Sequence, residues 1–483
     1  MNFKSLYIIP LCILLLSGAH GQTGGTALPS LSDFPARAES ILRDLEDHGH
    51  PFASVSLRAA DAENGDMTPV MVIDSNLFVT FDSIVLKGDV KLAKGILYPY
   101  LGLRRGMPYS ERLMRAVDRK LEELPFAVVA QPSGVSFVKD KAYLYVYLNA
   151  RRSSQFDGYI GLVPADERTG KVSVQGDLSL ALQNILRQGE SLGLHWYSSE
   201  RKSQHLDLAV KFPYLLRTRF GVEGSFLLDK KDTSYLNLNF HAGIPYAFVN
   251  NSYIEPYFDF TSSSLLDPSR LQLAGDSSLV DFRKTLYGLR ARYRRTDHPL
   301  NPRRGVDARA DLSAGQRKII PNPHADDGFY EGLAMQKTSF RLSASVQGYV
   351  PVWKRLALAP RVQAGTLLTG PHYFNELFKI GGPGLIRGFN PNDLHASTYL
   401  LYSVEIRYLF GRNSFADLFF DGGVYEQQLK DHYGFDTPFG FGAGVHVAVR
   451  SGVFYLEYAL GRQLGNPISL KTGKIHFGIQ VEF

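Results

Sequence analysis

Residues 400–410, LLYSVEIRYLF, decide the fold class of this chain. Counting from the first residue of this stretch, every second side chain is aliphatic or aromatic, while the positions between them include Ser403, Glu405 and Arg407. Side chains alternate between the two faces of a β-strand, so the pattern predicts a strand with one apolar and one polar face. Strands of this kind are typical of a protein wall that separates lipid from water.

The same alternation begins after Arg151 and continues to the last residue. It recurs in 206–212, in 287–294 and in 474–483. The alternative is a soluble β-sandwich, whose apolar faces would meet in pairs. A sandwich would rarely place Arg290, Arg292 and Arg294 along one strand face, so the pattern favours a barrel with a polar interior.

Residues 152–483 therefore predict a mainly β fold, a 16-stranded antiparallel transmembrane β-barrel. An even number of strands is usual in bacterial barrels of one chain. The sheet must close on itself, because bare strand edges are not tolerated in lipid. The long connections 261–280, 315–336 and 369–395 follow the seventh, ninth and eleventh predicted strands, so all three lie at the same end of the barrel.

Composition agrees with a large β-structure and excludes several functional classes. The 483 residues include 45 Gly, 26 Tyr, 31 Phe and a single Cys, which predicts a fold without disulfides. The net charge of +6 is too small to indicate nucleic-acid binding. The sequence has no Gly-x-Ser-x-Gly, HExxH or Cys/His cluster, so we predict no catalytic residues, no metal and no cofactor.

The N-terminal third is organised differently. Residues 1–21 have the three-part layout of a secretory signal peptide, and 22–34 form a polar leader. Residues 35–76 predict a helix followed by two strands. Residues 77–151 predict a small α+β module of order β-α-α-β-β, in which Ser110 caps the second helix. An exported chain without cysteine after cleavage is suited to the bacterial envelope.

The connection after the eleventh strand contains the motif Gly-Gly-Pro-Gly-Leu-Ile-Arg-Gly-Phe at 381–389. It resembles the sixth outer loop of the BamA/TamA-type outer-membrane assembly and translocation barrels, a superfamily that includes two-partner secretion transporters. The matching residues are Gly381, Gly382, Arg387, Gly388 and Phe389, and their partner motif is Phe419 and Asp421 on the thirteenth predicted strand. The resemblance implies that the loop folds into the lumen.

The rest of the chain extends this resemblance. Residues 77–151 look like a POTRA domain, and 35–76 look like the second half of another. The turn 297–305 is similar to the family's turn before its ninth strand. The last strand resembles the C-terminal signal of outer-membrane proteins, through Phe477, Ile479, Val481 and Phe483. About one and a half modules are fewer than a principal assembly factor usually carries, so the role of central assembly machine is in doubt.

The residues themselves suggest how the loop is held. Arg387 carries a planar fork of donors that can bind Asp421 through two hydrogen bonds, with Phe389 and Phe419 packed around the pair. We expect this latch to fix the loop in the lumen. Gly158, Gly161 and Pro164 weaken the first predicted strand, which would suit opening between it and the last one.

The predicted function is insertion or translocation of unfolded β-rich clients at the outer membrane without ATP. The partners implied are unfolded outer-membrane or secreted proteins, outer-membrane lipid and accessory lipoproteins, with the POTRA-like region in the periplasm. Two alternatives remain at this point. One is a dedicated two-partner-type secretion pore, and the other is a passive porin.

Overall fold

The computed structural model describes most of the chain after residue 24. The described residues are 25–27, 33–61, 67–166, 171–198, 203–248, 252–267, 279–298, 301–323, 330–368, 370–411, 413–430, 432–449, 452–462, 468 and 473–480. The predicted signal peptide, with Val481 and Phe483 of the C-terminal signal, lies outside them. In the described part of the chain, no helix has the length and apolar character needed to cross a membrane.

Two compact units make up the chain. One contains the residues up to Val85 together with Leu103–Val117 and Ser133–Tyr145, and the other contains Leu86–Gly102, Asp118–Pro132 and Val146–Phe483. The predicted 77–151 module contributes residues to both units. Its boundaries with the preceding segment and with the barrel therefore stay a prediction.

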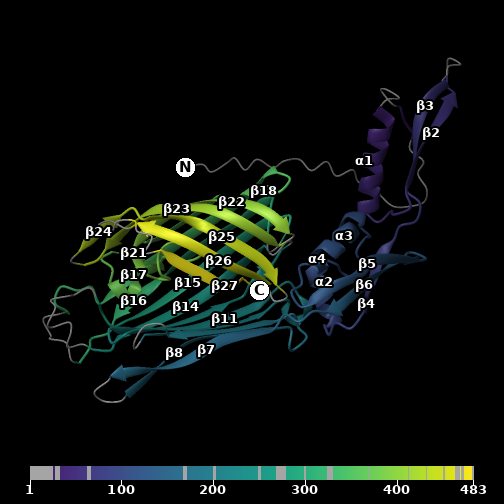
Figure 1. Ribbon diagram of the computed structural model, residues 1–483. Helices are drawn as coiled ribbons and strands as arrows, with labels where there is room; N and C mark the ends of the chain where they lie inside the picture. The colour runs from purple at the N-terminus through teal and green to yellow at the C-terminus, as the bar shows by residue number, and fades with distance from the viewer. Residues whose placement is uncertain are drawn as a thin grey trace, which may run out of the picture. The chain divides into compact units, whose positions relative to one another are not determined.

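The first unit begins with helix α1 (Phe34–Asp47) and a three-stranded sheet of order β1-β3-β2 (Figure 1). The strands are β1 (Gly25–Ala27), β2 (Ser54–Asp61) and β3 (Met67–Asp74). The helix and the β2–β3 hairpin were predicted. Strand β1 was not, because three residues of a polar leader carry no strand pattern, and it forms only where β3 offers a free edge.

The predicted POTRA-like module contains a second three-stranded sheet, of order β4-β6-β5. Its elements are β4 (Thr80–Lys87), α2 (Lys94–Leu101), α3 (Glu111–Arg115), α4 (Val117–Leu121), β5 (Ala127–Val138) and β6 (Lys141–Ala150). The predicted helix 111–124 is interrupted at Ala116, so it appears as α3 and α4. The Ser110 side chain caps α3 as predicted, accepting from the Leu113 backbone N–H at 3.4 Å.

Apolar packing within the first unit is centred on Val79, Tyr109 and Ala142, which are all buried. The Tyr109 hydroxyl donates to Glu111 at 2.5 Å, and burial together with this bond raises the pKa of the Tyr109 phenol. Helix α1 is tied to the start of α3, because Asp47 accepts from the Ser110 hydroxyl at 3.0 Å. The segment 35–76 is thereby packed against the module that follows it.

A single large antiparallel sheet forms the second part of the chain (Figure 1). The first strands are β7 (Gln155–Asp166), β8 (Lys171–Gln183), β9 (Ser191–Ser198), β10 (Gln204–Phe212), β11 (Val222–Lys231), β12 (Tyr235–Gly243), β13 (Tyr246–Ala247), β14 (Tyr253–Leu265), β15 (Phe282–Thr296) and β16 (Gly305–Ile319). The remainder are β17 (Gln336–Trp353), β18 (Leu356–Leu358), β19 (Arg361–Leu367), β22 (Thr398–Gly411), β23 (Ser414–Gln428), β24 (Tyr433–Asp436), β25 (Phe439–Val449), β26 (Gly452–Arg462) and β27 (Lys474–Gln480).

The strand order is that of a barrel, since the last strand, β27, returns to the place beside the first, β7. Continuous backbone pairing across this seam stays a prediction. Three positions in the sheet hold broken strands: β18 and β19 both pair with β17, β13 and β12 both pair with β14, and β24 and β25 both pair with β23. The strand number depends on how these pieces are counted, so sixteen also stays a prediction.

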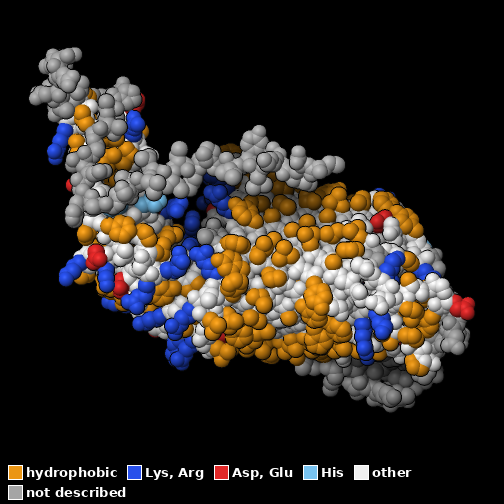
Figure 2. Space-filling view, turned by 180° about the vertical axis from the view of Figure 1, so that it is seen from behind, with side chains coloured by type: hydrophobic (Ala, Val, Ile, Leu, Met, Phe, Trp, Pro, Cys, Tyr) orange, Lys and Arg blue, Asp and Glu red, His pale blue; other side chains and the backbone are white. Residues whose placement is uncertain are grey.

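The predicted division into two faces is confirmed along β22. Leu400, Tyr402, Val404, Ile406, Tyr408 and Phe410 are exposed, and Leu401, Ser403, Glu405 and Leu409 are buried. On β15 the arginines of the polar face find acidic partners inside the barrel: Arg290 pairs with Asp311 at 3.0 Å and Arg292 with Asp307 at 2.6 Å. Figure 2 shows the resulting band of hydrophobic side chains on the outer wall.

Candidate functional site

The loop between β19 and β22 contains the residues that carried the family resemblance. It includes one turn of 3-10 helix (Phe374–Glu376) and two short paired strands, β20 (Phe378–Ile380) and β21 (Leu394–Ala396). The sequence predicted a glycine-kinked hairpin folded into the lumen, and the pairing of β20 with β21 forms such a hairpin. Gly381 and Gly382 follow β20 with φ of +110° and +86°, a backbone region that residues with a Cβ rarely adopt.

Arg387, at the tip of this hairpin, binds Asp421 of β23. Its Nε donates to Asp421 Oδ2 at 2.7 Å, its Nη2 donates to Oδ1 at 2.8 Å, and its backbone N–H donates to Oδ2 at 2.9 Å. The Ser403 hydroxyl of β22 also donates to Asp421 Oδ1, at 2.6 Å. Arg387 is 4% exposed and Asp421 is fully buried, so this bidentate pair is shielded from water.

Further acidic residues of the barrel wall surround the same guanidinium. Glu457 of β26 accepts from Arg387 Nη1 at 3.1 Å, while Glu405 and Asp417 lie at 3.6 and 3.7 Å. The Phe419 ring lies against the guanidinium, with its centroid 3.4 Å from Arg387 Cζ. We call Arg387 and these partners on β22, β23 and β26 the first anchor of the loop.

Glycines allow the loop backbone to approach the barrel wall closely. A Cβ on Gly388, which has φ +91°, would lie 2.7 Å from the backbone N of Gly461. A Cβ on Gly440 of β25 would lie 2.0 Å from the Arg387 carbonyl oxygen. Gly388 was predicted from the motif. Gly440 and Gly461 were missed, because a glycine within a strand gives no indication of which backbone lies across from it.

Gly440→Ala is expected to displace the loop without changing the charge of the site. The new methyl group would meet backbone atoms, which cannot rotate away as a side chain can, and overpacking of this kind costs about 1–3 kcal/mol. The variant should show faster proteolytic cleavage within 370–395 and a lower unfolding temperature. Gly134→Ala of β5 is a useful comparison, because a Cβ there meets nothing within 4 Å and Gly134, like Gly440, does not have a left-handed φ. Equal cleavage of Gly440→Ala and wild type would show that the loop does not need this close contact.

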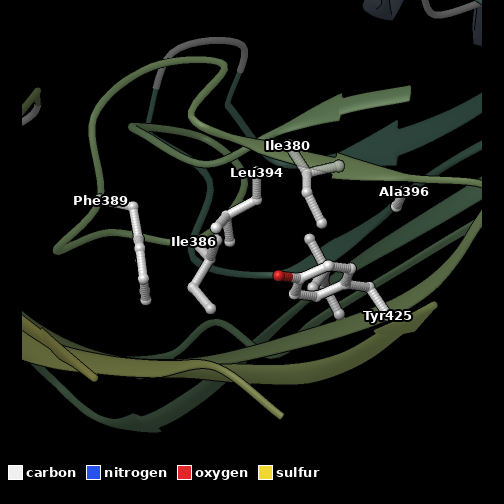
Figure 3. Close-up of a cluster of buried hydrophobic side chains, with 7 residues drawn as sticks. Ile380, Ile386, Phe389, Leu394, Ala396 and Tyr425 are labelled. Carbon is white, nitrogen blue, oxygen red and sulfur yellow. The ribbon is translucent and has the colours of Figure 1, made fainter. Parts of the chain in front are cut away.

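A hydrophobic cluster fills the space between the hairpin and the wall. Its buried members are Ile380, Ile386, Phe389, Leu394, Ala396, Leu401 and Tyr425. Figure 3 shows Ile386 and Phe389 extending from the loop towards the strands that carry Tyr425 and its neighbours. Phe389 is therefore buried in this cluster, and its predicted packing around the Arg387–Asp421 pair stays a prediction.

The beginning of the loop is bound to different strands. The Glu376 carboxylate accepts from Arg317 of β16 at 2.6 Å and from the Tyr373 backbone N–H at 3.1 Å, and Lys284 of β15 lies 3.7 Å away. The Glu376 side chain is 2% exposed. A buried carboxylate is tolerated only when such cations and donors compensate for lost hydration.

Neighbouring residues extend this contact along the wall. Asn375 donates to the Ser263 hydroxyl of β14 and to the Val280 carbonyl, both at 2.7 Å. Lys379 forms an ion pair with Asp229 of β11. We call Asn375, Glu376 and Lys379 with these partners the second anchor. The sequence alone did not indicate this anchor, because polar residues at these positions could equally face water.

The loop leaves part of the lumen open. A cavity of about 550 Å³ lies beside the second anchor and is lined by residues of β10, β11, β12, β14, β15 and β17 together with Asn375, Glu376 and Lys379. Its walls include His241, which binds Asp259 at 2.6 Å, and Arg290. The loop is thus bound on two sides of the barrel, and this cavity lies beside it.

Two groups of side chains in the described part of the barrel carry donors of the kind that metals bind. They are Glu223, His241 and Glu255, and Asp417, His446 and Glu457. In each group a carboxylate already binds an arginine: Glu255 pairs with Arg290 at 3.1 Å, and Glu457 pairs with Arg387 at 3.1 Å. We assign no ion to either group, and the expected absence of a metal stays a prediction.

The structure thus brings together Arg387, Gly388, Phe389, Phe419 and Asp421. Gly381 and Gly382 lie at the turn that leads to them. Of the predicted C-terminal signal, Phe477 and Ile479 lie in β27, and the Phe477 side chain is 71% exposed. Its role as a signal stays a prediction.

A family model described as the Omp85 superfamily domain matches residues 167–483. CdiB from Escherichia coli is similar in structure, with a TM-score of 0.54 and 15% identity over 93% of this chain and 84% of that one. CdiB from Acinetobacter baumannii has a TM-score of 0.52 and 12% identity over 87% and 76%.

BamA from Haemophilus ducreyi lacking POTRA domains 1–3 aligns over 93% of both chains, with a TM-score of 0.48 and 14% identity. No curated protein matches the sequence. At these identities the likeness to the two CdiB structures concerns the fold.

Proposed function

The chain belongs to the Omp85 superfamily, and on that premise we propose that it helps unfolded β-rich clients to enter or cross the outer membrane without ATP. It is an outer-membrane β-barrel protein with a periplasmic region, and members of this superfamily are insertion and transport factors rather than known enzymes. The driving force would come from the client. Each client strand that forms pairs its backbone groups and places apolar side chains in lipid.

The observation that carries this proposal is the loop held inside the barrel by Arg387. The two hydrogen bonds to Asp421 and the surrounding carboxylates hold the tip of the loop against β22, β23 and β26. We propose that the loop acts as a latch that stabilises the barrel between rounds of client handling. Binding of accessory lipoproteins stays a prediction.

The same observation separates this proposal from a passive porin. The loop is bound to strands on both sides of the barrel and so narrows the lumen, with the cavity of about 550 Å³ beside it. In a planar bilayer the protein should therefore show small or intermittent conductance. A large conductance that stays open would contradict the latch and favour the porin.

Depletion of the protein tests the function directly. We expect quantitative proteomics of the outer membrane to show reduced levels of several β-barrel proteins, while lipoproteins of the same membrane are unchanged. Loss of one exported protein alone would instead identify a dedicated two-partner-type secretion pore. An unchanged set of outer-membrane and exported proteins would reject both forms of the proposal.

A complemented strain controls for indirect effects of depletion. Wild-type protein and the Arg309→Ala variant should restore the proteome equally, because the Arg309 side chain is 55% exposed and lies outside both anchors. A defect that wild-type protein does not restore would show that the depletion itself caused the change.

A further inference from the structure

A basic pocket lies at one end of the barrel, where three strand connections meet. Its volume is about 400 Å³, and its lining includes Asp297, Arg303, Lys354, Arg355, Leu409 and Phe410. The connections join β15 to β16, β17 to β18 and β22 to β23. Because strands alternate in direction, these connections lie at the end where β7 begins, which is the periplasmic end of an outer-membrane barrel that follows a periplasmic region.

Arg303 lines this pocket and links two of the strand connections that surround it. Its Nη2 donates to the carbonyl oxygens of Trp353 and Lys354, at 3.1 and 2.6 Å, and so joins the turn before β16 to the turn after β17. The Nε of the same guanidinium is buried and has no hydrogen-bond partner in the described part of the chain. An unpaired buried donor on a charged group is costly, unless a bound acceptor pairs with it.

The charge of the pocket is positive. Lys354 and Arg355 are exposed beside Arg303, and Asp297 is the acidic residue in the pocket lining. The Asp297 carboxylate is engaged within its own turn, because it accepts from the backbone N–H of Arg303 at 2.9 Å and of Arg304 at 3.1 Å. Three cations therefore face one carboxylate whose oxygen already accepts two hydrogen bonds.

The pocket borders directly on the lipid-facing surface. Trp353, whose carbonyl binds Arg303, is 75% exposed, and Val352 beside it is 60% exposed. Phe410, on the other side of the pocket, is 51% exposed. Exposed tryptophan is typical of the boundary between the acyl chains and the headgroups, so the three cations lie at headgroup level.

We propose that this pocket binds the phosphodiester of an anionic phospholipid in the periplasmic leaflet. The guanidinium of Arg303 and the side chains of Lys354 and Arg355 would donate hydrogen bonds to the phosphate oxygens. Basic groups at this level of the membrane attract anionic lipid. The lipid chains would extend along Trp353 and Phe410. A free phosphate ion offers the same oxygens but gains nothing from the apolar border, which is why we favour the lipid.

Trp353 provides a local probe for the test. The chain has two tryptophans, so Trp196→Phe leaves the fluorescence of Trp353 alone. This full-length variant is reconstituted in phosphatidylcholine vesicles that contain a small fraction of brominated phosphatidylglycerol or, separately, of brominated phosphatidylcholine. We expect brominated phosphatidylglycerol to quench Trp353 several-fold more than brominated phosphatidylcholine at the same fraction.

Lys354→Gln/Arg355→Gln in this background should reduce the preference for phosphatidylglycerol by about fivefold for each cation removed. Both side chains are exposed, so the barrel should fold normally. The matched control is Arg283→Gln/Lys318→Gln, an exposed cross-strand pair near the other ends of β15 and β16. It removes the same charge and should leave the preference unchanged.

Three results would overturn the proposal. Equal quenching by the two brominated lipids would show that the site does not select an anionic headgroup. An equal loss in the control variant would show that total charge rather than the pocket attracts the lipid. Relief of quenching by inorganic phosphate, but not by chloride at the same ionic strength, would identify a site for free phosphate.

Discussion

Arg387→Ala is expected to release the loop from β22, β23 and β26 and to abolish the proposed client handling. The substitution leaves Asp421 buried and fully desolvated without the cation that binds it. Removing one partner of a buried ion pair lowers the free energy of unfolding by about 3–5 kcal/mol. The remaining charge has lost its hydration and no longer has an ion-pair partner to compensate for it. Chymotrypsin cleavage after Phe389, which lies two residues from the substitution and outside the second anchor, measures the release when followed by mass spectrometry.

Two further variants distinguish the latch from a general loss of charge. Arg387→Lys keeps a cation but cannot form the two parallel hydrogen bonds to Asp421, so an intermediate cleavage rate is expected. Arg309→Ala removes an exposed arginine of the barrel and should behave as wild type. If Arg387→Ala leaves both the cleavage rate and the outer-membrane proteome unchanged, the latch does not exist.

Glu376→Ala is expected to have an effect of similar size at the second anchor. Arg317 and Lys284 lie within 2.6 and 3.7 Å of this carboxylate, and both are buried. In the variant, Arg317 and Lys284 would stay buried but would lose the carboxylate that they share. The expected loss in the free energy of unfolding is again about 3–5 kcal/mol. The first half of the loop should become accessible at Lys379 while Arg387 still holds the tip, so cleavage after Arg387 should stay slow.

Glu376→Gln serves as the conservative comparison. It retains an acceptor for the Tyr373 backbone N–H but loses the negative charge, so it should be destabilised less than Glu376→Ala. Slow cleavage after Lys379 in both variants, with normal unfolding temperatures, would show that Glu376 does not hold the loop.

The double variant Arg387→Ala/Glu376→Ala tests whether the two anchors act through one loop. They bind different walls, β22 to β26 on one side and β11 to β16 on the other. If the loop joins these walls, the two single effects on cleavage should not add, because a loop freed at one end is already partly released. Strictly additive effects would mean that each end is held independently.

Loop release bears on the proposed opening between β7 and β27. Gly158 of β7 has φ +149°, and a Cβ there would lie 2.3 Å from the Asp177 carbonyl oxygen of β8. This part of the first strand therefore requires a glycine, which contributes no side chain to the sheet. Whether the seam opens when the loop leaves its anchors stays a prediction, which cross-linking cysteines placed on β7 and β27 would test.

The sequence by itself determined the class of fold and the position of the decisive loop. Alternation with period two identifies strands and their lipid-facing sides without knowledge of any partner, because the geometry of a strand sends neighbouring side chains to opposite faces. This is why the exposed and buried positions of β22 could be predicted from residues 400–410 alone. The pairing of Arg387 with Asp421 could be expected because both residues belong to a recognisable motif.

Only the tertiary structure revealed the second anchor, the close approach of Gly440 to the loop, and the basic pocket at the strand connections. Glu376 lies 59 residues from Arg317, and Asp229 lies 150 residues from Lys379. No local periodicity links residues so far apart, since their contact depends on how the sheet curls and where the loop enters it. The roles of such residues are set by burial and by the partner across the lumen, and both exist only once the chain has folded.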